Sequence, residues 1–249
     1  MNKKERSDNR KALPKFFLTI FLAALGGAVV GVFSSFSGAE ELFVQLAESA
    51  KTGLQGIAPY SFWILLIVLG GAEALLYKQA KKLFETWDGE EESTVEQAEE
   101  KLSQSLLLTS VHVILNLFFA GVFFLLGAEG ALLGLTGFVV SFAVVILMQQ
   151  KTVDLEKKMN PEKKGSVYDT NFQKKWIESC DENEQRKIGA AAMRSFRMVN
   201  NVCVVLWVIL VFFSLVYLVG ILPMFLVLLI FGVNQVSYCL EAIRLEKKK

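Results

Sequence analysis

Six apolar stretches dominate the pattern of hydrophobic and polar positions along the chain. Each is 17 to 23 residues long, contains no Lys or Arg, and is continuous rather than alternating; together they cover residues 16–36, 59–77, 105–127, 131–148, 201–218 and 223–239. A helix of about 20 apolar residues crosses the hydrocarbon core of a bilayer, whereas a barrel strand requires alternating polarity. The pattern therefore predicts an all-α polytopic membrane protein with six transmembrane helices.

The positions of Lys and Arg predict how these helices are oriented. Twenty-five of the 26 Lys and Arg residues lie in alternate segments, namely residues 1–15, 78–104, 149–200 and 240–249. Positively charged segments stay on the cytoplasmic side because their translocation is opposed. We therefore predict that both termini lie in the cytoplasm and that the helices form three hairpins. Residues 1–249 are predicted to form a single integral membrane domain that contacts the lipid bilayer.

Two further patterns accompany the first predicted span. Gly27 and Gly31 form a G-x-x-x-G motif, which lets another helix approach closely. This motif serves either packing within the chain or homo-oligomerisation. Residues 37–58, on the predicted outer side, intersperse Leu and Phe with Glu, which favours a short amphipathic helix lying at the outer interface.

The largest segment between spans, residues 149–200, is predicted to form a small cytoplasmic helical cap. Gln149–Met159 extends the fourth span, and Asn160-Pro161 ends it because proline cannot continue a helix. A short helix follows, and an S-x-x-E capping box at Ser179–Glu182 opens the helix that leads into the fifth span. The short helix carries an apolar face made of Phe172, Trp176 and Ile177. That face is either a docking surface for a cytoplasmic protein or the contact through which the cap packs on itself.

A few polar side chains lie within the apolar stretches. Ionisable groups are costly in a membrane and are functional candidates for that reason. The candidates for an intramembrane polar site are Glu73, His112, Asn116, Asn234 and Gln235. Glu73 and His112 lie on neighbouring antiparallel helices, so they are expected within reach of one another as a proton-linked site. The alternative is that Glu73 extends to the interface, while His112 and the amides form hydrogen bonds between helices.

Composition limits the chemistry that the chain supports. The 249 residues include one His and three Cys, 53% of the residues are hydrophobic, and no H-E-x-x-H, G-x-S-x-G or phosphate-binding Gly-rich motif occurs. We therefore predict no enzymatic activity, no cofactor and no metal site, and we interpret the cysteines as free thiols. Acidic residues balance the basic ones in the predicted cap, which argues against nucleic-acid binding.

One stretch of the predicted cap resembles a known family. It contains Asn160-Pro161, Gly165-Ser166, Tyr168-Asp169, Phe172, Lys175-Trp176 and Ser179-Cys180-Asp181-Glu182-x-Glu184, followed by small residues that lead into the fifth span. This signature is similar to that of an uncharacterised family of six-span membrane proteins from Gram-positive bacteria, defined by a domain of unknown function. The resemblance implies a bacterial plasma membrane, and it implies no activity or ligand.

Two hypotheses about function follow from these patterns. In the first, the protein is a non-enzymatic membrane protein that acts through its cytoplasmic helical segments as a regulatory or partner-binding protein. In the second, it is a permease-like transporter subunit that relies on a separate ATPase, and the five intramembrane polar residues line its pathway. A polar cavity that reaches the middle of the membrane would favour transport, whereas a close-packed bundle would favour the first hypothesis.

Overall fold

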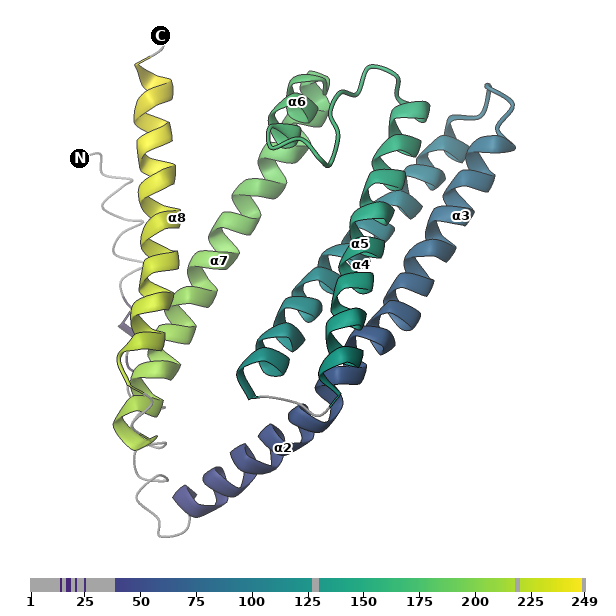
Figure 1. The fold of residues 1–249 in the computed structure, drawn as a ribbon. Coiled ribbons are helices and arrows are strands. Elements are labelled where there is room, and N and C mark those ends of the chain that lie inside the picture. The colour runs from purple at the N-terminus through teal and green to yellow at the C-terminus, as the bar shows by residue number, and fades with distance from the viewer. Residues whose placement is uncertain are drawn as a thin grey trace, which may run out of the picture. The chain divides into compact units, whose positions relative to one another are not determined.

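The fold was described from a computed structural model of the chain (Figure 1). The structure describes residues 39–126, 130–217 and 220–247, together with Pro14, Phe17, Leu18, Phe21 and Leu25. Within these residues every regular element is a helix and no strand occurs. The elements are α2 (Ala39–Leu65), η1 (Leu66–Gly70), α3 (Gly71–Glu85), α4 (Glu92–Leu126), α5 (Ala131–Met159), α6 (Phe172–Glu178), α7 (Glu182–Tyr217) and α8 (Leu222–Glu246).

Five helical stretches among the described residues are long and apolar enough to cross a membrane. They are Val44–Glu85, Ser93–Leu126, Ala131–Met159, Glu182–Val211 and Leu222–Glu246. They contain the second, fourth and sixth predicted spans whole, and they overlap the third span, 105–127, and the fifth, 201–218, in part. The all-α class is thereby confirmed for the described residues, and five helical stretches suit a membrane protein. The first predicted span, 16–36, and its G-x-x-x-G motif lie outside the described residues apart from Phe17, Leu18, Phe21 and Leu25. The sidedness of the helices stays a prediction.

The segment before the second span differs from the prediction. Residues 37–58 were expected to form a separate interfacial helix, but α2 continues from Ala39 through Pro59 to Leu65 without a break. The backbone then passes through η1 into α3. Proline is tolerated within a membrane helix where neighbouring groups compensate for its missing N–H, which explains why Pro59 does not end the helix.

The chain divides by its internal contacts into two compact units. One comprises Met1–Leu46 with Lys187–Lys249, and the other comprises Ala47–Arg186. In the second unit α3, α4 and α5 run side by side as a bundle (Figure 1). The loop 86–91 joins α3 to α4, and α5 begins at Ala131 shortly after α4 ends at Leu126. Such short connections make successive helices antiparallel.

Two apolar layers bracket the middle of this bundle. One is an aromatic layer in which the Phe62 ring meets Phe123 and Phe138 edge-on, at centroid distances of 6.2 and 5.5 Å. The other layer lies nearer the loop 86–91 and is formed by buried small and aliphatic residues, namely Ala80, Ala98, Leu102 and Leu155. The helix segments between the two layers carry the buried polar residues described below.

Small residues on α5 permit the close packing of this unit. Gly134, Gly137 and Ser141 are all buried. A Cβ atom at Gly137 would lie 2.7 Å from Trp63 Nε1 and 3.1 Å from Phe62 Cβ. The helices therefore approach one another at a distance that only glycine accommodates at this position.

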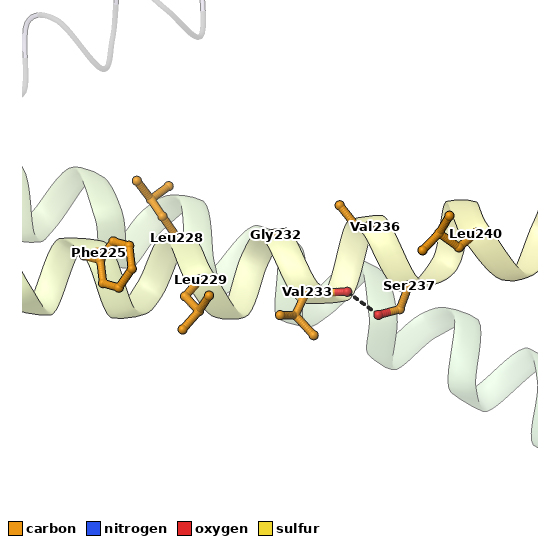
Figure 2. Close-up of a pocket in the computed structure, with 8 residues that line it drawn as sticks. All are labelled: Phe225, Leu228, Leu229, Gly232, Val233, Val236, Ser237 and Leu240. Carbon is orange, nitrogen blue, oxygen red and sulfur yellow. Dashed lines mark hydrogen bonds between the residues drawn. The ribbon is translucent and has the colours of Figure 1, made fainter.

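The other unit contains α8 and the part of α7 from Lys187 onward. Asn234 on α8 donates a 2.9 Å hydrogen bond to the side-chain oxygen of Asn200 on α7, and the Phe196 and Tyr238 rings stack beside it at 4.8 Å. A shallow apolar furrow follows α8, with Gly232 at its centre and Ser237 as its polar member (Figure 2). The Ser237 hydroxyl bonds back to the Val233 carbonyl, which satisfies it within the helix.

Candidate functional site

The middle of the α3–α4–α5 bundle contains a buried polar cluster. Its members are Glu73 from α3, His112 and Asn116 from α4, and Ser141 from α5, and the exposed fraction of each residue is 0%. Glu73 and His112 come from facing helices, while Asn116 lies one helical turn beyond His112 on the same face. Three of the five predicted intramembrane polar residues therefore lie together between the two apolar layers.

A chain of hydrogen bonds connects the cluster. Glu73 Oε1 lies 3.1 Å from His112 Nδ1, and His112 Nε2 lies 3.0 Å from Ser141 Oγ. Ser141 Oγ in turn lies 2.9 Å from Asn116 Nδ2 and 3.1 Å from Asn116 Oδ1. The second carboxylate oxygen, Glu73 Oε2, is buried without a hydrogen-bond partner. The prediction that Glu73 and His112 come within reach is confirmed.

This chain can be satisfied in two directions. In one, His112 donates from Nδ1 to Glu73, the Ser141 hydroxyl donates to Nε2, and the Asn116 amide donates to Ser141. In the other, His112 donates from Nε2 to Ser141, and the Ser141 hydroxyl donates to the Asn116 carbonyl. The hydrogen bonds between Glu73, His112, Ser141 and Asn116 can therefore be formed in either direction.

The backbone beside the cluster is irregular. Residues Leu66–Gly70 form a π-helical turn, and Glu73 follows in the first turn of α3. A π-turn takes one more residue than an α-turn and is frequent at functional sites. Gly70 is buried against the His112 ring, with 3.8 Å between His112 Cε1 and the position of a Cβ at Gly70. The π-turn therefore lies in contact with the titratable pair.

For these polar residues, the structure contradicts one of the stated alternatives and confirms another. The alternative in which Glu73 extends to the interface is wrong, because its side chain is fully buried and faces His112. The expected hydrogen bond between helices is confirmed for His112, whose partners lie on α3 and α5, and for Asn234, which bonds to Asn200. Asn234 and Gln235 belong to the other compact unit.

The segment predicted as a cap contains the expected helices. α5 ends at Met159 with Asn160 as its C-cap, α6 carries Phe172 and Trp176, and α7 begins at Glu182. The capping box lies two residues later than expected: Glu184 N donates to Asp181 Oδ1 at 2.7 Å, and Asp181 N donates to Glu184 Oε2 at 3.1 Å. The prediction that Ser179 caps α7 is wrong, because the Ser179 hydroxyl instead donates to the Trp176 carbonyl.

A buried lysine holds the loop of this segment against the start of α7. The Lys163 side chain is largely buried and its ammonium contacts Glu184 Oε2 and Cys180 Sγ. Burial opposes the charge of Lys163, but these two contacts outweigh it and raise its pKa, while the same ammonium lowers the pKa of Glu184. The sequence analysis did not single out Lys163, since a lysine in a polar loop gives no signal of burial. The buried and free Cys180 agrees with the interpretation of the cysteines as thiols.

The predicted docking residues divide between two environments. The Phe172 and Trp176 rings contact each other at a centroid distance of 5.5 Å and are half-buried. Both line a groove of about 680 Å³ between α4, α5 and α6. Ile177 is 41% exposed and does not line that groove. Asp169, which precedes α6, accepts a hydrogen bond from Asn171 N and pairs with Lys175, whose ammonium keeps the pKa of Asp169 low.

The chain also matches a family over nearly its whole length. The family model described as "Protein of unknown function (DUF3169)" matches residues 7–242. The chain belongs to this DUF3169 family. No curated protein and no solved structure matches the chain. The resemblance to a family of unknown function is therefore confirmed, and the six spans and the bacterial origin of DUF3169 proteins stay expectations. In the part of this DUF3169 chain that the structure describes, no three His, Cys, Asp or Glu side chains are grouped closely enough to hold a metal ion.

Proposed function

We propose that the protein is a non-enzymatic integral membrane protein that regulates or binds a soluble partner through its cytoplasmic helical segments. The five apolar helical stretches support a location in a membrane. The concentration of Lys and Arg in residues 149–200 supports a cytoplasmic position for the segment that carries α6. A bacterial plasma membrane is the location that the resemblance stated above implies.

The observation that carries this proposal is that accessible apolar side chains lie around α6, whereas the polar side chains of the bundle are buried. The four polar side chains in the middle of the bundle have no exposed surface. By contrast, the segment around α6 presents an open groove lined by Phe172 and Trp176, and Ile177 is exposed beside it. Exposed aromatic and aliphatic groups beside charged residues are typical of protein interfaces. The geometry therefore supports recognition at α6 better than transport through the bundle.

The transport alternative receives less support from the described residues. It requires Glu73, His112 and Asn116 to line a polar pathway, but these side chains bond to one another or to Ser141 and are closed off from solvent. A pathway would have to open by separating α3, α4 and α5. The first hypothesis requires no such rearrangement.

Photo-crosslinking in native cells tests the proposed function. A photoreactive phenylalanine analogue replaces Ile177, and the control places the same analogue at Tyr168, which is also exposed but lies outside α6. We expect an adduct of defined mass from position 177 that is absent from position 168 and that is lost when Trp176 is also changed to Ala. Equal adducts from both positions, or none from either, would contradict partner binding through α6.

A further inference from the structure

We propose that the groove between α4, α5 and α6 binds a small amphipathic cation, namely an organic amine with an aromatic or branched alkyl body. The groove lies entirely within the compact unit of residues 47–186. Its volume of about 680 Å³ falls in the range of small-molecule sites. The inference concerns a small ligand in the same groove whose Phe172 and Trp176 support the proposed protein partner. The two proposals are distinguished by their readouts, which are a crosslinked adduct at position 177 for the partner and saturable binding of an amine for the ligand.

One wall of the groove is apolar and aromatic. Leu102 and Leu106 come from α4 and Val153 comes from α5, while Phe172 and Trp176 face them from α6. Indole and phenyl faces attract organic cations through their quadrupoles as well as through burial of apolar surface. This wall therefore suits a ligand whose body is apolar and whose head is positive.

The polar members of the groove include two carboxylates. Glu99 on α4 and Glu156 on α5 are bridged by Asn160, whose Nδ2 lies 2.8 Å from Glu99 Oε1 and 3.0 Å from Glu156 Oε1. Within the described ranges neither carboxylate forms a salt bridge, because the nearby Lys163 is paired with Glu184. Glu99 and Glu156 thus line the groove without a salt-bridge partner among the described residues.

A buried hydroxyl is a second and independent indication of a ligand. Thr152 lies one turn before Glu156 on α5, lines the same groove, and is only 1% exposed. Its Oγ1 has no hydrogen-bond partner. A buried polar group without a partner is destabilising, so an ammonium N–H would satisfy this hydroxyl once the Thr152 side chain rotates toward the groove. Thr152 and the two carboxylates together provide acceptors and no positive charge.

The charge of Glu99 and Glu156 also makes the affinity for the cation depend on pH. Burial and the neighbouring Glu99 raise the pKa of Glu156 to about 6. Lys163 opposes this shift, and Glu184 adds to it. A bound cation stabilises the ionised form of Glu156, so affinity for the cation falls as pH decreases below about 6.

Calorimetric titration of the purified full-length chain in lipid nanodiscs tests the proposal. The probe is 1-naphthylmethylammonium, and 1-naphthylmethanol and 1-naphthylacetate provide the same ring with no charge and with a negative charge. Empty nanodiscs give the partition of each compound into lipid. We expect saturable binding of the ammonium only, weakened roughly tenfold or more in the E99Q/E156Q variant and in Trp176→Ala.

The matched control is Glu162→Gln. Glu162 is an exposed acid in the loop that follows α5, and it does not line the groove. We expect it to bind the ammonium like the unchanged chain. Melting curves and gel filtration establish that each variant is folded, and Thr152→Val tests the hydroxyl without a change in charge. Equal binding of the three naphthyl compounds, equal loss in Glu162→Gln, or no saturable binding to the folded unchanged chain would overturn the proposal.

Discussion

Glu73 and His112 are buried side by side where neither can reach water. Removing one partner of a buried pair leaves the other unsatisfied, and Glu73 Oε2 already has no partner. We expect His112→Ala to lower the free energy of unfolding by about 3 kcal/mol, and Glu73→Ala to lower it by a similar amount. The double variant should lose less than the sum of the two single changes.

A double-mutant cycle in mild detergent measures this coupling. Denaturant unfolding of the unchanged chain, both single variants and the double variant gives the four free energies. Ser110→Ala serves as a control on the same helix, since its exposed hydroxyl bonds only to the carbonyl one turn before it. Strictly additive losses at Glu73 and His112 would show that the two side chains do not interact.

Part of this residue-scale picture follows from the sequence. Glu73 and His112 stand out in apolar stretches on adjacent helices, so their meeting was predictable. The sequence did not single out Ser141, because a serine in an apolar run gives no indication that it forms hydrogen bonds across a bundle. Glu99, Glu156 and Thr152 were not singled out either, since their convergence depends on how α4 and α5 pair in three dimensions.

At the scale of elements, the glycines of α5 determine how closely the helices pack. A Cβ at Gly137 would lie 2.7 Å from Trp63 Nε1, which donates to the Leu133 carbonyl, and 3.1 Å from Phe62 Cβ. We expect Gly137→Ala to lower the free energy of unfolding by about 1–3 kcal/mol through overpacking. Gly121→Ala on α4 is the matched control, because nothing lies within 4 Å of its added methyl group.

Thermal unfolding in detergent distinguishes these variants. The control should unfold at the same temperature as the unchanged chain or slightly above it, since alanine favours a helix more than glycine does. If Gly137→Ala behaves like Gly121→Ala, the helices do not approach as closely as described.

The extension of α5 beyond the predicted end of the fourth span carries a pH-sensitive group. The pKa of Glu156 is raised to about 6 in the fold, above its ordinary value of 4.5. The folded state therefore binds more protons than the unfolded state between these values, and Glu156 contributes stability as pH falls through that window. Above it, the buried charge is unfavourable.

We expect Glu156→Gln to unfold at a higher temperature than the unchanged chain at pH 7.5, with a difference that shrinks as pH decreases from about 6 toward 4.5. Parallel melting curves of the two proteins over this pH range measure the difference directly. Glu162→Gln should show no such pH-dependent difference, because Glu162 is exposed. A constant difference at all pH values would contradict the shifted pKa.

The helices themselves were largely predictable, whereas their joins were not. Continuous apolar runs locate the membrane helices because the bilayer admits few other structures. A separate helix was expected before Pro59, but α2 continues through it. Proline ends a helix in water more readily than in a membrane. The π-turn at Leu66–Gly70 has no sequence signature beyond adjacent glycines. The capping box moved from Ser179 to Asp181 because both positions fit the pattern and only the loop geometry selects between them.

For the whole molecule, the apolar helices indicate a membrane protein, and the charge pattern predicts which of its segments face the cytoplasm. Both the proposed partner and the proposed ligand depend on that assignment. Each requires α6 and its groove to face the cytoplasm, where soluble proteins and the reducing environment suited to free thiols are found. The sidedness of residues 149–200 is therefore the central claim of this account.

Cysteine labelling of intact cells tests that claim most directly. In a chain whose three native cysteines are changed to serine or alanine, a single cysteine is placed at Lys174 on α6 or at Ile221 before α8, both of which are exposed. A membrane-impermeant maleimide is predicted to label position 221 in intact cells and position 174 only after the membrane is permeabilised. Labelling of position 174 from outside intact cells would contradict the account.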